Sequence, residues 1–368
     1  MAAGLLAAAG CLPPPPPTQV CGQSFGSASQ YQSSFYNLGH AGTGWITADG
    51  FVPPVLPDGR AQLPDGRVVW WMSDTMTGTV GGGNSVPSPV NVHNSTVDQG
   101  GGCLTPHLVA IPYNSSQWSW PGSAVVVGNT LEVFSHTVVP ASGPPGFDWQ
   151  VTGSSRTRFS LPGLQLIDGP TNMPSHSNQD TAGEAIPWGV RSFFNAADNK
   201  VYLYGQTGGL FTSRTWAARA PAGQETNVGT WQFFTDAPAP NDPWSPNFAD
   251  VKPMAFTKNG GQPDGPPIAQ LSVVPYGNRY LAGAFTWDTI SPDIRAWVSV
   301  TPWGPWEQQP AATATFQKRT NDQTAYDAHI VNLPGAGRTV VYSVNDPINQ
   351  QQDFTLYRGE FAAPNGLP

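Results

Sequence analysis

Two aspartates, Asp49 and Asp74, have the residue type and spacing that acid–base chemistry requires. Each ends a short apolar run, because Trp45-Ile-Thr-Ala precedes Asp49 and Trp70-Trp-Met-Ser precedes Asp74. Side chains alternate between the faces of a strand, so two adjacent strands joined by a loop can bring both carboxylates to one end of a sheet. A pair of carboxylates is the minimum equipment for hydrolysing a glycosidic bond. Aspartates also end strands for purely structural reasons, and position alone leaves both explanations open.

A polar segment, Asn91-Val-His93-Asn94-Ser95, follows the second aspartate. His93 and Asn94 are candidate contacts to a sugar beside the carboxylates. The same residues are also common in loops, where their side chains satisfy local turns.

The composition favours strands joined by tight turns. Glycine (41) and proline (39) together exceed a fifth of the 368 residues, and only 11% are charged. Such a chain is typical of an all-β protein. A net charge of −8 with only 16 Lys and Arg argues against nucleic acid or an anionic membrane as the main partner. The 14 tryptophans are compatible with a neutral glycan, although most aromatic side chains serve as core.

One pattern recurs five times: a tight turn followed by a strand rich in Val, Tyr, Phe and Trp. The five copies are residues 65–74, 128–137, 198–207, 277–286 and 335–345. Each has a candidate strand before it and another after it, and two add an outer strand around Trp231 or Trp306. Five antiparallel units of three to four strands predict one five-bladed β-propeller. A tandem of small sandwiches is the alternative, but no linker separates the units.

In a propeller, the first strand of each blade lines the central channel. Asp49, Trp188, Gln270, Asp327 and His329 are expected at the entry ends of these strands. Three long loops, residues 76–104, 169–185 and 239–266, are expected to form the walls of a ligand funnel. For His329, a purely structural hydrogen-bonded role is an equally good explanation.

The N-terminus predicts export. Residues 1–10 form a small apolar run that ends at Cys11, and five prolines follow at 13–17. Ala-Ala-Gly-Cys11 resembles the lipidated box of a bacterial lipoprotein, although no basic residue precedes the run and Ala8 stands where leucine is usual. The run is too short to span a bilayer. We expect residues 1–22 to be a signal and tether, and residues 23–368 to be one exported, monomeric catalytic domain.

The remaining cysteines, Cys21 and Cys103, can form a disulfide if the protein is exported. Three cysteines without close spacing make no zinc site, and no two histidines form an HExxH pair. We therefore predict neither a metal nor another cofactor.

Several motifs together resemble a known family. The sharpest are Asp49-Gly50, residues 63–67 (Leu-Pro-Asp-Gly-Arg) and residues 71–75 (Trp-Met-Ser-Asp-Thr), and residues 219–221, 302–306 and 342–345 agree loosely. With the five repeated units, they resemble the DUF4185 propellers. Members of that family are glycoside hydrolases that act as endo-D-arabinanases on mycobacterial cell-wall arabinan, as found in arabinogalactan and lipoarabinomannan.

The resemblance implies that Asp49 and Asp74 are the catalytic pair of an inverting enzyme. Inversion requires carboxyl groups roughly 6.5–9.5 Å apart. Because Asp74 follows Trp70, Trp71 and Met72, it is expected in the drier setting and therefore as the acid, with Asp49 as the base. The implied sugar contacts are His93, Asn94, Trp188, Gln270, Asp327 and His329.

One departure from the family pattern is a duplication. Leu-Pro-Asp-Gly-Arg occurs at 56–60 and again at 63–67, between the two aspartates. We expect the insert to lengthen a loop at the far end of the hairpin and to leave both carboxylates in place. A shift of the strand register by an odd number of residues would turn Asp74 to the wrong face.

Two other functions remain open. One is a glycan-binding propeller that has kept the fold and lost the chemistry. The other is a hydrolase for a different furanoside or pyranoside, such as plant L-arabinan.

Overall fold

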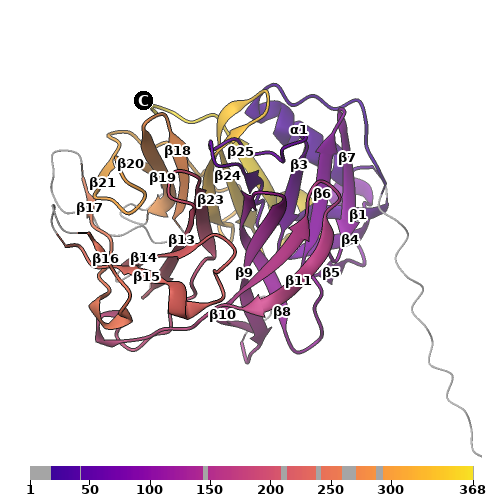
Figure 1. Cartoon of the computed structure of the whole chain (residues 1–368). Coiled ribbons are helices and arrows are strands. Elements are labelled where there is room, and N and C mark those ends of the chain that lie inside the picture. The colour runs from indigo at the N-terminus through magenta and orange to yellow at the C-terminus, as the bar shows by residue number, and fades with distance from the viewer. Residues whose placement is uncertain are drawn as a thin grey trace, which may run out of the picture.

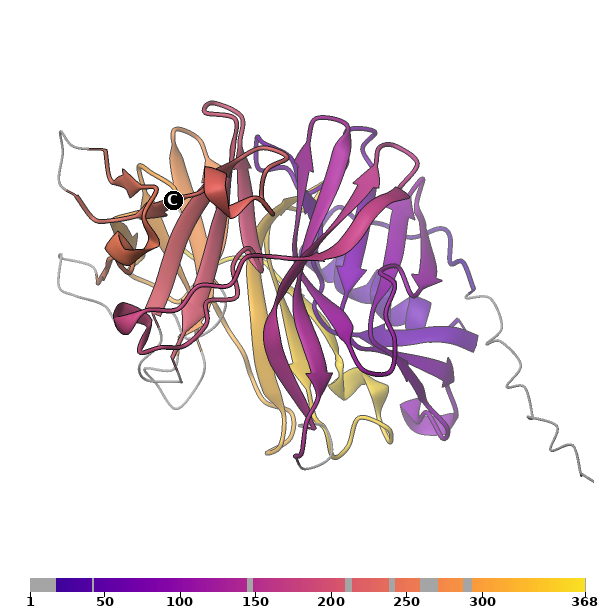
Figure 2. The same ribbon diagram turned by 60° about the horizontal axis from the view of Figure 1, so that its bottom comes forward.

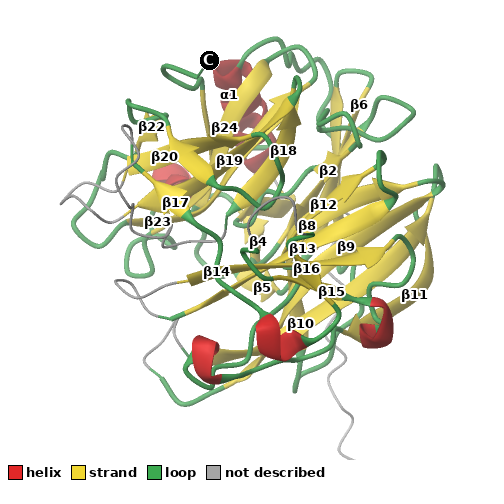
Figure 3. Cartoon of the chain, turned by 60° about the vertical axis from the view of Figure 1, so that its left-hand side comes forward, coloured by secondary structure: helices red, strands yellow, loops and turns green. Residues whose placement is uncertain are grey.

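The computed structural model describes residues 18–41, 43–143, 148–208, 214–237, 242–258, 271–286 and 293–367. Strands dominate, and one α-helix lies to one side of them (Figures 1 and 3). The signal-like segment with Cys11, as well as Gln270, lies outside the described residues. No helix in the described ranges is both long and apolar enough to cross a membrane.

The first part of the chain forms two short sheets. One contains β1 (Thr43–Ala48), β4 (Thr75–Thr79) and β5 (Val90–Val92), and the other β3 (Val68–Met72), β6 (Ser95–Gly100) and β7 (Cys103–Leu108). Two residues separate β3 from β4, and two residues separate β5 from β6. The two sheets are therefore halves of one bent antiparallel arrangement.

The next three sheets have more strands, and most of their strand pairs are antiparallel. The sheet that follows contains β2 (Pro54–Val55), β8 (Trp118–Val127), β9 (Thr130–Pro140), β10 (Trp149–Ser160) and β11 (Gln165–Asn172). The next contains β12 (Arg191–Asn195), β13 (Lys200–Thr207), β14 (Arg214–Pro221), β15 (Gln232–Phe234) and β16 (Trp244–Ser245). The third contains β17 (Phe256–Thr257), β18 (Ser272–Tyr276), β19 (Arg279–Thr286), β20 (Asp293–Ser299), β21 (Trp306–Gln308) and β22 (Ala314–Thr315).

The last sheet contains β23 (Thr324–Leu333), β24 (Gly337–Asn345) and β25 (Arg358–Ala362). Its long hairpin, β23–β24, runs through the middle of the molecule, between the two short sheets of the first part and the sheet of β17–β22 (Figure 2). Short helical turns occur in the connections: η1 (Gly82–Asn84), η2 (Gln179–Thr181), η3 (Val228–Thr230), η4 (Phe248–Asp250) and η5 (Phe354–Leu356).

The inner strands of successive sheets lie side by side. Strand β8 contacts β12, β12 contacts β18, and β18 contacts β23. These four strands and the segment around Val52 surround one small internal cavity. The arrangement is all-β and propeller-like, as predicted, but the sheets do not close into a ring. The described strands make six sheets, so the predicted count of five blades is not confirmed.

The turn-and-strand repeats are found where the sequence predicts them. The strands after the five turns are β3, β9, β13, β19 and β24. The predicted outer strands around Trp231 and Trp306 are β15 and β21. One prediction is wrong: residues 76–104, expected to form a loop, are mostly strand.

Helix α1 (Ala28–Gly39) was not expected from the composition. Ser27 caps it by accepting a hydrogen bond from the Gln30 backbone N–H. Its apolar side chains recur at helical spacing, and Tyr31, Phe35 and Leu38 pack against Trp70 in the first core cluster. The N-terminal segment before the helix is held by the predicted disulfide, because Cys21 and Cys103 are bonded.

The duplicated motif folds as two turns of the same design. In the first, the Leu56 N–H donates to the Arg60 carbonyl and the Asp58 carboxylate accepts from the Arg60 side chain. The second repeats both contacts seven residues later. Because each turn closes on itself, Val52 still pairs with Trp71, and the register between the two aspartates is kept.

A buried charged cluster joins two neighbouring sheets. Glu132 on β9 lies near Arg156 on β10 and Glu225, which follows β14. The Arg156 Nη1 atom donates to Glu225 Oε2 at 2.8 Å, whereas Glu132 Oε2 accepts no hydrogen bond. Burial, and next the charge of Glu225, raise the pKa of Glu132 to about 8.

This cluster makes stability depend on pH. Between the ordinary glutamate pKa and about 8, the folded protein holds a proton at Glu132 that the unfolded chain releases. Raising the pH through this window therefore lowers the free energy of unfolding. We expect Glu132→Gln to be more stable than the wild type at pH 8, by a few kcal/mol at most, and similar to it at pH 4.5.

Thermal unfolding at both pH values measures this difference. Glu225→Gln is the matched control, because it breaks the ion pair with Arg156 and is expected to destabilise the protein. If Glu132→Gln gained the same stability at pH 4.5 and at pH 8, the pKa of Glu132 would not be raised as described.

Candidate active site

The two aspartates lie at the break between the two halves of the first sheet. The Asp49 N–H donates to the Asp74 carbonyl at 3.2 Å, and the Ser73 N–H donates to the Asp49 carbonyl at 3.0 Å. Gly50 bends the chain there with a φ of +64°, and a Cβ atom in its place would lie 2.5 Å from Ser73 Oγ. Only glycine fits this position, which explains the Asp49-Gly50 motif.

Both carboxylates line a cavity of about 870 Å³. Its walls come from the first sheet, the sheets of β8–β11 and β12–β16, and the last sheet. The lining residues used below are Asp49, Asp74, Trp120, Trp149, Arg191, Thr215, Asp322, Tyr326, Asp327, Asn345, Ile348, Gln350 and Tyr357. A volume of this size accommodates several sugar units or a drug-sized ligand.

Asp49 is the more enclosed of the two. Its Oδ1 atom is buried without a hydrogen-bond partner, and its Oδ2 atom accepts from the Tyr326 hydroxyl at 2.6 Å. Burial, and next the charge of Asp74, raise the pKa of Asp49 well above its ordinary value, while the Tyr326 hydrogen bond opposes the shift. A carboxyl group in this setting holds its proton to a higher pH than an exposed aspartate does.

Asp74 lies in a more polar and accessible setting. Its side chain is 35% exposed, and its Oδ1 atom accepts from the Trp120 indole N–H at 2.8 Å. His93 Nδ1 lies 2.9 Å from the same oxygen and can donate to it as the Nδ1–H tautomer. The expectation that Asp74 occupies the drier setting is wrong, because the sheet break turns its side chain into the cavity and away from buried Trp70 and Trp71.

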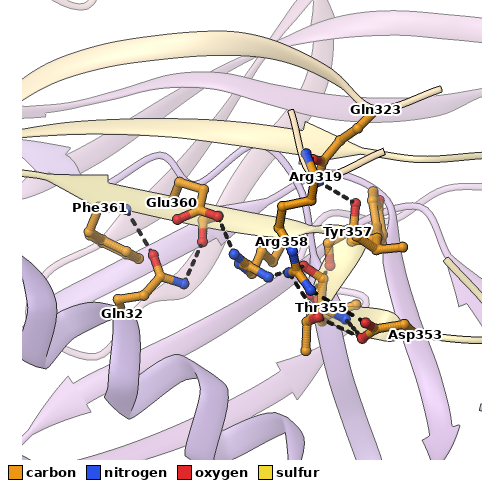
Figure 4. A network of polar contacts seen from close by, with 12 residues as sticks. Gln32, Arg319, Gln323, Asp353, Thr355, Tyr357, Arg358, Glu360 and Phe361 are labelled. Carbon is orange, nitrogen blue, oxygen red and sulfur yellow. Dashed lines mark hydrogen bonds and ion pairs between the residues drawn. The ribbon is translucent and has the colours of Figure 1, made fainter. Parts of the chain in front are cut away.

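A network of polar contacts behind the cavity holds Tyr357, whose hydroxyl donates to the Asp74 carbonyl at 2.5 Å. On one side of this tyrosine, Arg319 donates to the Thr355 carbonyl and hydroxyl, and Asp353 caps the η5 turn (Figure 4). On the other side, Arg358 contacts Glu360 (Figure 4). Gln32 on α1 anchors the end of this strand, because it accepts from the Phe361 N–H at 3.0 Å. The helix thus contributes indirectly to the position of Asp74.

Asp327 and Arg191 form a buried ion pair at the floor of the cavity. Asp327 has a φ of +59° and lies where the register of β23 shifts. Asn and Asp tolerate this left-handed conformation better than most residues. Arg191 also donates to the Gly122 carbonyl on β8, so it connects three sheets. Despite burial, the charges of Arg191 and then His329 hold the pKa of Asp327 far below its ordinary value.

Not all predicted contacts reach the cavity. Asn94 is fully buried, and its amide exchanges two hydrogen bonds with the backbone of Ile111, at 2.8 and 3.0 Å. Trp188 is fully buried in a core cluster. His329 lies beneath the floor, 3.4 Å from Asp327 Oδ2. Of the predicted contacts, Asp327 lines the cavity and His93 contacts Asp74, whereas Asn94, Trp188 and His329 do not line it.

Sequence reasoning missed Trp120, Trp149, Arg191, Tyr326 and Tyr357. Tyr326 directly precedes Asp327 in the strand already singled out, and that position was the available signal. Trp120 and Trp149 belong to long strands whose register no local motif reveals. In the described part of the chain, no three His, Cys, Asp or Glu residues gather to hold a metal ion.

The fold and the cavity define this chain as a propeller-like β-protein with an acidic, aromatic-walled site. It belongs to the family described as "Domain of unknown function (DUF5005)", whose model matches residues 32–365. The resemblance to the DUF4185 propellers is therefore wrong. Short motifs such as Asp-Gly-Arg before a strand are turn signals that many β-proteins share, and they do not separate the two families. A search of the curated proteins finds no match.

Solved structures with a similar fold include a "putative hydrolase" from Bacteroides ovatus. It is 17% identical with a TM-score of 0.62, and the match covers 92% of each chain. The GH43_1 enzyme from Xanthomonas citri complexed with xylose is 13% identical with a TM-score of 0.48, over 88% of each chain. CoXyl43, a β-xylosidase/α-arabinofuranosidase from a compost microbial metagenome, is 13% identical with a TM-score of 0.46, over 88% of this chain and 91% of its own. At these identities, the Bacteroides ovatus structure supports the fold alone.

Proposed function

We propose that this protein is a glycoside hydrolase that uses Asp49 and Asp74 as its acid–base pair. The observation that carries the proposal is the asymmetry of the two carboxyl groups in one cavity. Burial and the neighbouring charge raise the pKa of Asp49, while Asp74 faces the cavity and accepts two hydrogen bonds at a single oxygen. Environments that separate two titratable groups in this way suit an acid and a base.

In this mechanism, Asp49 donates its proton to the oxygen of the leaving sugar, and Asp74 acts on water or on the anomeric carbon. These roles reverse the assignment expected from the sequence. Trp120 and His93 orient the Asp74 carboxylate and stabilise its charge. Inversion was implied only by the DUF4185 resemblance and is not part of this proposal; the anomeric configuration of the first product, measured by NMR, distinguishes inversion from retention.

The substrate is less well defined than the chemistry. D-Arabinan was implied by the resemblance to another family, so it is one substrate to test among several. The experiment is to incubate the full chain with D-arabinan from mycobacterial arabinogalactan, plant L-arabinan, xylan, mannan and β-glucan, and to measure new reducing ends. An Asp49→Asn/Asp74→Asn double variant serves as the blank. Hydrolysis of at least one glycan supports the proposal, while binding without hydrolysis by a folded protein supports a glycan-binding propeller instead.

The tyrosine beside Asp49 provides a test of the acid. The Tyr326 hydrogen bond lowers the pKa of Asp49, so Tyr326→Phe should raise that pKa further. Activity then persists to higher pH, because the acid loses its proton later. We expect the alkaline limb of the plot of kcat against pH to shift to higher pH, with less than about a tenfold change in kcat at pH 6. Tyr202→Phe, which is remote from the cavity, is the control, and an unchanged alkaline limb would contradict the assignment.

We also propose five blades, export and a single catalytic domain from residue 23. The hydrogen bonds between Asp49, Ser73 and Asp74 support counting the first two sheets as one blade. The Cys21–Cys103 disulfide supports an oxidising compartment. A lipid at Cys11 and a monomeric state stay predictions, which the mass of the mature N-terminus and light scattering test.

A further inference from the structure

The cavity has two different walls on either side of the carboxylate pair. The first sheet, which carries Asp49 and Asp74, lies between the sheet of β8–β11 and the last sheet, because β3 contacts β8 and β1 contacts β25. Trp120 and Trp149 line the cavity on the first of these sides, and Asn345, Ile348 and Gln350 line it on the other. A ligand centred on the carboxylates therefore meets both walls.

The first wall is aromatic. Trp149 is 37% exposed although it lines the cavity, and its ring contacts that of Trp120 edge to face, with centroids 4.7 Å apart. Trp120 in turn donates to Asp74. A braced indole suits the apolar C–H face of a sugar ring, because stacking buries apolar surface at little cost in side-chain entropy.

The second wall presents hydrogen-bond acceptors. Asn345 Oδ1 and Gln350 Oε1 are buried atoms that accept no hydrogen bond from the protein. Such an atom costs about 1–3 kcal/mol unless it finds a partner. The loop that carries Gln350 is fixed by Asp346, which is fully buried and accepts from the Ile348 and Asn349 N–H groups at 3.1 and 2.9 Å. Rotation of either side chain, without a rearrangement of the loop, turns its oxygen into the cavity, where a sugar hydroxyl can donate to it.

The charge of the cavity selects against anionic ligands. Among its described lining residues are four acidic side chains, of Asp49, Asp74, Asp322 and Asp327, and one guanidinium, of Arg191. That guanidinium is already paired with Asp327. A uronate or sulfate group would therefore meet net negative potential and find no free arginine or lysine among these residues.

We propose that the cavity binds an internal segment of a neutral polysaccharide, with one sugar stacked on Trp149 and another hydrogen-bonded to Asn345 and Gln350. The linkage between them lies at Asp49 and Asp74, so cleavage occurs within the chain. This inference rests on the proposed hydrolase function for the cleavage, but not for the binding.

Affinity electrophoresis tests the binding separately from the chemistry. The full-length Asp74→Asn protein is run through gels that contain plant arabinan, mycobacterial arabinogalactan, xylan, mannan or β-glucan, with polygalacturonate as the anionic comparison. At least one neutral polysaccharide should retard the protein, and polygalacturonate should not. Adding Trp149→Ala or Gln350→Ala should weaken the retardation at least about fivefold, while Leu166→Ala, on the exposed edge strand β11, should leave it unchanged.

Several results overturn the inference: no retardation by any neutral polysaccharide, stronger retardation by polygalacturonate, or equal retardation of the Trp149 and Gln350 variants and the parent. With the wild type, chromatography should show intermediate oligosaccharides first, and release of single sugars from the start contradicts internal cleavage. If the neutral gels retard the parent but not the two variants, and no glycan is hydrolysed, the hydrolase proposal fails while the two-walled binding site stands.

Discussion

Asp49→Asn should lose about 10²–10⁴-fold in kcat on a polysaccharide and yet keep most of its activity on a dinitrophenyl glycoside of the same sugar. In the proposed mechanism, the buried Asp49 carboxyl group supplies a proton to the leaving oxygen, whereas a dinitrophenolate departs without one. Asn is close to the size of Asp and can accept the Tyr326 hydrogen bond, so the cavity should keep its shape. The ratio of the two rates, measured for variant and wild type, isolates the proton donation.

Asp74→Asn is the matched variant, and it should lose activity on both substrates, because no leaving group replaces a base. The reverse pattern, with Asp74→Asn rescued by the activated substrate and Asp49→Asn not, would assign the acid to Asp74.

The same Asp49 variant has a second signature in stability. The pKa of Asp49 is raised on folding, so the folded wild type loses stability as the pH rises above the ordinary aspartate pKa. Asn cannot ionise, so Asp49→Asn should be more stable than the wild type at pH 8 and nearly equal to it at pH 4. A variant that is less active and more stable at pH 8 identifies Asp49 as a functional residue.

Arg191→Met should destabilise the protein by about 3–5 kcal/mol at pH 7, the typical effect of leaving a buried charge without its partner. Asp327 would then keep its charge at the floor of the cavity without its guanidinium partner. Without Arg191, burial is opposed less and raises the pKa of Asp327, so the unpaired carboxylate takes up a proton as the pH falls and the penalty for its charge is removed. The effect of the substitution should therefore shrink toward pH 4.

Urea unfolding at pH 7 and pH 4 measures this effect. Asp327→Asn is the partner variant, and it keeps a residue type that tolerates a φ of +59°. The Arg191→Met/Asp327→Asn double variant should lose less free energy of unfolding than the two single variants together. The difference is the coupling energy between the two groups. Additive losses would show that Arg191 acts through its contact with Gly122 rather than through the ion pair.

The sequence predicts those parts of the fold that depend on local chemistry. The five turns that precede β3, β9, β13, β19 and β24 are short-range signals, because Gly, Asn and Asp favour the turn conformations themselves. Asp49 and Asp74 were found because each ends an apolar run. The disulfide followed from the number of cysteines and the prediction of export.

What the sequence could not give depends on contacts between distant segments. Asn94 satisfies the backbone of Ile111, and Trp188 enters a core, although both types are also common at sugar sites. The sequence predicts the drier setting for Asp74, whereas Asp49 occupies it in the structure, because apolar neighbours along the chain do not determine burial in three dimensions. Arg191 and Asp327 form an ion pair although they are 136 residues apart in the sequence, and no local pattern predicts such a pair.

The two tandem turns at 56–60 and 63–67 have an evolutionary consequence. Each copy contains its own turn-closing backbone hydrogen bond, its own glycine and its own contact between an aspartate and an arginine. A gene can therefore gain such a copy in one replication slip, without compensating changes elsewhere, and the strands on either side remain aligned. The end of the molecule opposite the cavity can thus change in length while the distance between the Asp49 and Asp74 carboxyl groups is preserved.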